Sequence, residues 1–346
     1  MTDLQGLLRA CSVLVLGVAA ACGASSDART PEAVAFLAVP DTMGAVPANV
    51  RRIAVQARPE LVENSGATLS GTQPGVIFTI NDSGNDPLLF ALDTAGRDRG
   101  VWRVMRARNQ DWEAMSVGPC GSTTGIPSPD SAATRAAGTP NDCVYLGDVG
   151  DNDARRPSRI IYRVPEPSVE RAGFVGSVAA EALVYRYDDG PHDVEAMYVA
   201  PNGSVFLITK RQLKAGDGHR RPALVFELPA SAWGSSDLPV IAGRVDSLPI
   251  VPGSASRRQV TDAALSPDGR LLAVRTYGQV FVFSTDSSTG RVNRDVPPSV
   301  CNLESLGRWQ GEGIAWFGRG ATLVLTSEGR TSPMFAVDCP MPTATQ

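Results

Sequence analysis

The sequence predicts an all-β fold and, within that class, a β-propeller. A short phrase recurs along the chain: an acidic residue, then a small residue, then an apolar strand. Each copy continues into two or three further short strands, separated by turns rich in Gly, Asp, Asn and Pro, which is the pattern of antiparallel sheets. Repeats of about 50 residues with four strands each are typical of propeller blades.

Four clear copies and one divergent copy of the phrase predict five blades. The clear copies are centred on Glu113, Glu195, Asp262 and Glu312, and the divergent copy starts at Glu63. An eroded sixth blade within residues 229–260 or 284–310 is the alternative count. Because the last copy ends after three strands, we expect residues 50–57 to supply the missing outer strand and close the ring.

Composition and charge favour a folded domain and exclude one class of partner. Of the 346 residues, 43% are apolar and 20% are charged, which is enough apolar material for a core. The net charge is −4, whereas nucleic-acid binding requires a basic face. We therefore expect no nucleic-acid partner.

The N-terminus has the features of a bacterial export signal. Arg9 precedes an apolar run over residues 10–21, which is too short to span a bilayer and fits a signal peptide. The small residues before Cys22 are similar to a lipobox, in which the cysteine is acylated, and ordinary cleavage after Ala21 is the alternative. Both alternatives predict export, and the first predicts a lipid anchor on the outer side of a bacterial membrane.

These features divide the chain into three predicted segments. Residues 1–21 are the signal peptide, 22–48 form a flexible tether, and 49–340 form the propeller. A low-complexity insertion occupies residues 121–142 of the propeller.

Export makes disulfide bonds the expected state of the four remaining cysteines. Four cysteines allow three pairings. Cys120 and Cys143 bracket the low-complexity insertion, so we favour a bond between them, which leaves Cys301 to pair with Cys339. A thiolate metal site is not expected, because the sequence has no CxxC spacing.

The recurring phrase predicts a group of carboxylates at one mouth of the central channel. The first strand of each blade lines the axis, so the acidic residues of the four clear copies should lie around one opening. The second strands end in charged residues, and Lys210, Arg275 and Glu328 complete the predicted ligand-binding set. Carboxylates that face one another need raised pKa values, a cation or basic partners. The alternative at each position is a structural hydrogen bond to the backbone of the neighbouring blade.

Two loops that follow second strands are candidate calcium sites. Residues 82–86 and 148–153 share the pattern Asp-x-Gly-(Asn/Asp)-(Asp/Asn). Calcium prefers about six to eight hard oxygens, often from closely spaced carboxylates, so Asp82, Asp148 and Asp151 are the predicted metal ligands. Neither loop has the full EF-hand pattern, and a hairpin turn with an Asx hydrogen bond would use the same residues.

Little in the sequence supports nucleophilic catalysis. His192 and His219 are the only histidines, and no G-x-S-x-G elbow occurs. No organic cofactor is indicated. The arginine pair Arg155 and Arg156 is interpreted as solvated loop charge.

Five strings carry a family resemblance. They are residues 80–85 (INDSGN), 111–113 (DWE), 147–152 (GDVGDN), 162–167 (YRVPEP) and 266–269 (SPDG). These strings resemble a family of secreted bacterial β-propellers of uncharacterised function and, more remotely, phytase-like, esterase-like and NHL-type propellers. The resemblance covers most of residues 50–340 and specifies the fold rather than the activity.

The phytase-like resemblance implies calcium ions held by carboxylates at one mouth, with basic side chains gripping phosphate. By that similarity, metal would be held by Glu113, Asp148, Asp151, Glu195 and Glu312. Lys210 and Arg275 would then meet an anion. The NHL-type resemblance implies binding without catalysis.

We therefore expect a binding or scaffold propeller. Its partner would be a small molecule or a protein at the acidic mouth, with calcium as the one cofactor. The alternative is a calcium-dependent phosphoester hydrolase.

Overall fold

The computed structural model describes residues 46–47, 49–121, 142–169, 171–210, 222–250, 259–303, 306, 311–318 and 321–343. These residues form β-strands and one short 3-10 turn, with no α-helix among them, so the predicted all-β class is confirmed. They belong to the unit Leu37–Gln346. The predicted signal peptide, Cys22, most of the tether and almost all of the insertion lie outside the described residues.

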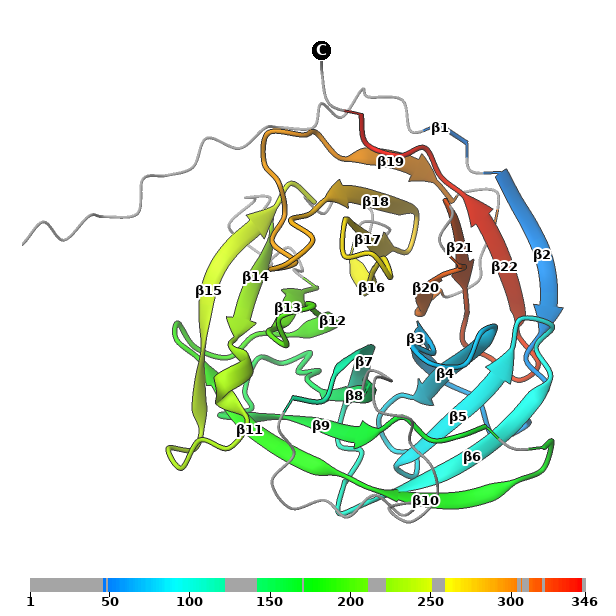
Figure 1. The fold of residues 1–346 in the computed structure, drawn as a ribbon, viewed down its shortest axis with the longest axis horizontal. Helices are drawn as coiled ribbons and strands as arrows, with labels where there is room; N and C mark the ends of the chain where they lie inside the picture. The colour runs from blue at the N-terminus through cyan, green and yellow to red at the C-terminus, as the bar shows by residue number, and fades with distance from the viewer. Residues whose placement is uncertain are drawn as a thin grey trace, which may run out of the picture. The chain divides into compact units, whose positions relative to one another are not determined.

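The strands lie in concentric order around a centre (Figure 1). The innermost strands are β3 (Asn64–Leu69), β7 (Trp112–Pro119), β12 (Val194–Val199), β16 (Val260–Leu265) and β20 (Ile314–Trp316). Each pairs antiparallel with a second strand, namely β4 (Val76–Asn81), β8 (Asp142–Asp148), β13 (Val205–Thr209), β17 (Leu271–Thr276) and β21 (Thr322–Leu325). This radial arrangement of antiparallel sheets is that of a β-propeller.

Two further layers of strands lie outside these. The third strands are β5 (Leu88–Asp93), β9 (Arg159–Pro165), β14 (Ala223–Leu228), β18 (Gln279–Ser284) and β22 (Pro333–Asp338). The outer strands are β6 (Asp98–Met105), β11 (Glu181–Tyr187), β15 (Val240–Leu248), β19 (Ser299–Asn302) and β2 (Asn49–Val55). In the described parts of residues 229–260 and 284–310, the strands are β15 and β19, so these stretches supply outer strands rather than a sheet of their own.

Hydrogen bonding joins the strands into four sheets within the described residues. One of them has eight strands, because the meanders β7–β8–β9–β11 and β12–β13–β14–β15 are joined by the parallel pair β11 and β15. Two more strands extend outer edges in parallel: β10 (Val175–Ala179) on β6, and β1 (Val46–Pro47) on β19. These additions cover strand edges that would otherwise be open to pairing with another chain.

The N-terminal strand closes the ring as expected. Strand β2 pairs antiparallel with β22 from Asn49 opposite Asp338 to Val55 opposite Pro333. The last sheet therefore contains strands from both ends of the propeller (Figure 1), and this pairing ties its first and last segments together.

Glycines let the inner strands approach one another: Gly313 is the small residue of its copy of the phrase, and Gly118 lies farther along β7. A Cβ atom added to Gly313 would lie 2.8 Å from the Cβ of Ala67, and one added to Gly118 would lie 2.4 Å from Cγ1 of Val199. Both distances are too short for real carbon atoms, so a larger side chain would push the strands apart. Between the sheets, apolar side chains of β4, β12 and β13 are buried along the whole length of each strand.

Both predicted disulfides are confirmed. Cys120 bonds to Cys143 and Cys301 bonds to Cys339, with Cα–Cα distances of 5.0 and 5.6 Å. On the chain-entropy model, loops of this size gain about 3–4 kcal/mol each. Disulfides persist in oxidising compartments, which fits export. In the described ranges no helix has the length and apolar character needed to span a membrane.

Candidate functional site

The structure brings three carboxylates of the recurring phrase together at one end of the inner strands. Glu113, Glu195 and Glu312 are all buried, at 5%, 2% and 4% exposure. Burial raises the pKa of Glu113 well above its ordinary value, and the charge of the nearby Glu195 raises it further. The repeat therefore places distant acidic residues within electrostatic reach of one another.

A backbone irregularity sets the position of these carboxylates. The pairing of β7 with β8 shifts between Trp112 and Ala114, so Glu113 is the extra residue of a β-bulge. The pairing of β12 with β13 shifts in the same way around Glu195. An extra residue bends the strand and re-aims its side chain, so both glutamates leave the regular alternation of their strands.

Each of the three glutamates accepts a hydrogen bond from a described side chain. Lys210 Nζ lies 2.6 Å from Glu195 Oε1, Tyr277 Oη lies 3.1 Å from Glu312 Oε1, and Ser65 Oγ donates to Glu113. Burial alone would lower the pKa of Lys210, but the Glu195 carboxylate raises it overall. Lys210 is thus a charged partner of Glu195.

Asp262 and Arg275 hold the inner strands together instead of facing the mouth. Asp262 accepts hydrogen bonds from the backbone N–H groups of Ala67 in β3 (3.2 Å) and Ile314 in β20 (2.8 Å). Arg275 donates to the carbonyl oxygens of Gly313 (2.6 Å) and Thr326 (2.7 Å). Asp262 therefore has the structural role given above as the alternative, a hydrogen bond to neighbouring backbone. Arg275 also has a structural role, because both of its acceptors are backbone carbonyls.

Glu328 lies close to Glu312 at the same mouth. Burial raises the pKa of Glu312 to about 7, and the charge of Glu328 is the next cause. The pKa of Glu328 is also raised to about 7, first by burial and then by the charge of Asp82. These two carboxyls are therefore partly protonated near neutral pH.

The densest group of carboxylates is the acidic corner, which we define as Asp82, Asp111 and Glu113. One oxygen of each lies within 4.8 Å of the others. Burial raises the pKa of Asp111 to about 6, and the charge of Asp82 raises it further. The absent side chain of Gly150 leaves room for this group, since an added Cβ would lie 2.6 Å from Asp111 Oδ2 and 2.7 Å from Glu113 Cγ.

The neighbouring arginine corner comprises Asp148 and Asp151 with Arg156 and Arg159. Arg156 Nη2 lies 2.6 Å from Asp148 Oδ1, and Arg159 Nη2 donates to Asp151 Oδ2. All four side chains are buried. Arg156 is 14% exposed and its partner Asp148 2%, while Arg159 is 1% exposed and its partner Asp151 5%. The structure does not group Asp148 and Asp151 with Asp82, because each is held by its own arginine.

Sequence reasoning missed two features of this mouth. Asp111 was not singled out, although it lies two residues before Glu113 in the string DWE. The pair Arg155 and Arg156 was interpreted as solvated, which fits Arg155 at 81% exposure and is wrong for Arg156 at 14%. His192 bonds to Asp189 (2.6 Å) and is not a member of the acidic corner.

Comparisons with known proteins add little beyond the coordinates. No family model and no curated protein matches the chain. Among solved structures, it is similar to Myxococcus xanthus glutaminyl cyclase (11% identity, TM-score 0.45, 86% of this chain and 99% of that chain). It is also similar to the pyranose dehydrogenase PQQ domain from Coprinopsis cinerea (14%, 0.44, 84% and 95%) and to a gluconolactonase from Xanthomonas campestris (12%, 0.38, 86% and 97%). The propeller assignment rests on the strand pairings above and not on these similarities.

Proposed function

We propose that the protein is an exported five-bladed binding propeller whose acidic corner holds a divalent cation, with calcium as the ion that suits it. In this proposal each four-strand meander is one blade, and the eight-stranded sheet counts as two. A lipid on Cys22 would hold the propeller at the outer side of a bacterial membrane. The function is binding rather than catalysis.

The observation that carries the proposal is the convergence of Asp82, Asp111 and Glu113 without a basic partner among them. Their oxygens lie within 4.8 Å of one another, and burial raises the pKa values of Asp111 and Glu113. Burial and the neighbouring carboxylates raise both values, although Arg156 partly lowers that of Asp111, so the corner itself lacks enough positive charge. A cation among the three oxygens would supply it.

The donor chemistry fits calcium. All three side chains offer hard carboxylate oxygens, and calcium takes about six to eight oxygens in flexible geometry. Three carboxylates supply at most about six if each binds through both oxygens. Open coordination positions would then be available to oxygen atoms of a small molecule or of a partner protein at the mouth, beside Glu312 and Glu328.

The hydrolase alternative finds no support in the basic residues. It needs Lys210 and Arg275 to grip a phosphate, but Lys210 is paired with Glu195 and Arg275 donates to two backbone carbonyls. Both cations would have to leave buried partners first, which is costly. Binding is therefore the function that this mouth supports best.

Titration calorimetry with calcium chloride tests the proposal. The wild type and Glu113→Gln are compared, with Asp153→Asn as the matched control, since Asp153 is 72% exposed and lies outside the acidic corner. We expect saturable binding by the wild type and the control. Loss of one carboxylate ligand should weaken calcium binding by roughly tenfold or more. Equal binding by all three proteins, or none by the wild type, would contradict the proposal.

A further inference from the structure

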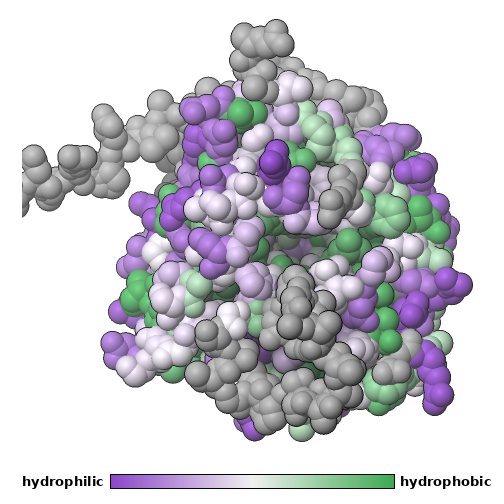
Figure 2. All heavy atoms as spheres, viewed as in Figure 1, coloured by the Kyte–Doolittle hydropathy of each residue, from purple (hydrophilic) through white to green (hydrophobic). Residues whose placement is uncertain are grey.

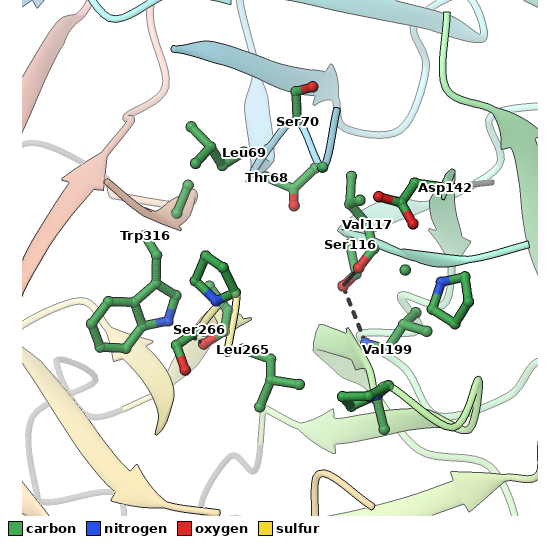
Figure 3. A pocket seen from close by; sticks show the side chains of 18 of the residues that line it. Thr68, Leu69, Ser70, Ser116, Val117, Asp142, Val199, Leu265, Ser266 and Trp316 are labelled. Atoms are coloured by element: carbon green, nitrogen blue, oxygen red, sulfur yellow. Dashed lines mark hydrogen bonds between the residues drawn. The ribbon is translucent and has the colours of Figure 1, made fainter. Parts of the chain in front are cut away.

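A cavity lies at the opposite end of the inner strands from the acidic corner. Its volume is about 290 Å³, at the small end of ligand pockets. The surface of the propeller is hollowed near its middle in Figure 2. Figure 3 shows the cavity from close by. Its walls come from the ends of the inner strands and the turns that follow them, including Ser70, Val117, Val199, Leu265 and Trp316.

The cavity has a mixed lining of apolar side chains and polar groups, and several of the polar groups already have partners. Pro119, Pro201 and Pro267 follow three of the inner strands and are rigid, apolar parts of the lining. The Trp316 indole N–H is used by the carbonyl of Ala264 (2.9 Å). The Ser116 hydroxyl already accepts the N–H of Val199 at 3.1 Å, as the dashed line in Figure 3 marks.

Asp142 is the one acidic side chain of the lining, and no basic residue is among the described residues that form it. Its position depends on Gly71, where an added Cβ would lie 2.2 Å from Asp142 Oδ2. Burial raises the pKa of Asp142, and the nearby Glu166 carboxylate raises it further. Glu166 itself is held by the Ser70 hydroxyl and by the N–H of Gly71 at 3.0 Å, so it adds negative charge behind the wall.

In the part of the chain that the structure describes, no hydrogen bond or ion pair engages the Asp142 carboxylate. The Ser70 hydroxyl of this wall donates to Glu166 instead. A half-buried carboxylate has lost part of its hydration, and a charged N–H donor would restore the lost interaction. A neutral donor would restore less of the lost interaction, and an anionic ligand would add repulsion.

We propose that this cavity binds a small organic ammonium ion, with its nitrogen donating to Asp142 and its carbon chain against the proline, valine and leucine walls. The proposal does not depend on the calcium site, because it uses the other end of the inner strands and shares no residue with the acidic corner. A primary ammonium fits best, since it brings both the charge and the N–H donors that the carboxylate lacks.

The test compares two probes of nearly equal size, n-butylammonium and butan-1-ol, by ligand-observed NMR and calorimetry at low salt. We expect the wild type to prefer n-butylammonium by roughly tenfold or more, because one charged hydrogen bond distinguishes the two probes. Asp142→Asn should remove this preference, and the surface control Asp153→Asn should retain it.

The wild-type comparison keeps the proposal falsifiable even where Asp142→Asn does not fold. Equal binding of the two probes, or no saturable binding of n-butylammonium, would overturn the proposal. Saturating calcium distinguishes the two mouths. If calcium displaces n-butylammonium, the ammonium ion was bound at the acidic corner, and the cavity proposal fails. Retention of the ammonium in the presence of calcium supports it.

Discussion

The acidic corner and the arginine corner lie at the same mouth and begin alike, yet their carboxylates are in opposite situations. Asp82 directly follows β4 and Asp148 is the last residue of β8, and their loops share one sequence pattern. Asp148 is neutralised by Arg156, whereas Asp82 faces Asp111 and Glu113. The pattern of the loop therefore does not decide the role of its carboxylate; the presence of a cation a few residues downstream does.

The difference separates carboxylates that stabilise the fold from carboxylates that are available to a ligand. A buried carboxylate with an arginine is satisfied within the chain, and removing its partner leaves an uncompensated charge. Buried carboxylates that face one another cost stability until a proton or a metal ion joins them. Substitutions in the two corners should therefore have opposite effects on the stability of the metal-free protein.

The largest effect is expected from breaking the arginine corner. Arg159→Met removes the buried partner of Asp151, and we expect the free energy of unfolding to fall by about 3–5 kcal/mol. Urea denaturation followed by circular dichroism measures it. The control is Arg155→Ala, whose side chain is 81% exposed and whose loss should change stability by less than about 0.5 kcal/mol. Similar small effects for both variants would mean that the Arg159–Asp151 pair does not stabilise the fold.

The opposite sign is expected in the acidic corner. Glu113→Gln removes one of three crowded carboxylates while keeping an oxygen that accepts from Ser65. In the presence of chelator, we expect the variant to be more stable than the wild type, because it removes a buried carboxylate and its repulsion by Glu195 and Asp82. The same denaturation experiment measures it, and a less stable variant would mean that Glu113 serves the fold.

The pH dependence of stability should follow from the raised pKa values. In the folded protein the pKa values of Glu312 and Glu328 are about 7, above the ordinary value of 4.5. Between these limits the folded state binds more protons than the unfolded state, so stability is highest below the lower value and is lost as pH rises through about 7. With chelator present, we expect Tm to be a few degrees higher at pH 5 than at pH 8.

Calcium should reduce this pH dependence, because it binds deprotonated carboxylates and so favours high pH. The measurement is the difference in Tm between the two pH values with and without calcium. A Tm that rises with pH in chelator would show that the carboxylates of the mouth are satisfied by partners other than protons.

The smallest effect, on calcium affinity, is expected from filling the space beside Gly150. A methyl group there would press on Asp111 Oδ2 and Glu113 Cγ, so Gly150→Ala should weaken calcium binding by a few fold in calorimetry. Gly243→Ala is the matched control, because an added Cβ at Gly243 meets no atom within 4 Å. An unchanged affinity in Gly150→Ala would show that the corner does not depend on this close approach.

Local sequence patterns predicted most of the fold. Strands β4 and β13 occupy apolar runs between turn residues, which is the local signal of a buried strand. The turn that contains Pro267 and Gly269 also forms, with Gly269 at a φ of 71°, which a glycine adopts without strain. Strand β10 was not predicted, because it pairs in parallel with β6 over a long sequence separation and lacks a local signal.

The site was predicted less completely, because a single bulge changes which residue faces the mouth. The phrase aligned Asp262 with Glu113 and Glu195. In β16, however, the pairing shifts between Val260 and Asp262, so Thr261 is the extra residue. A shift by one position re-aims a side chain, and Asp262 therefore reaches the neighbouring backbones. No sequence feature distinguishes the two placements of the bulge.

The most direct test of the central claim is a crystal structure of the protein grown with calcium. The account predicts an ion between Asp82, Asp111 and Glu113, with an oxygen of each about 2.3–2.6 Å away, while Asp148 and Asp151 keep their arginines. Calcium bound elsewhere on the propeller, or only water between these three carboxylates at saturating calcium, would contradict it.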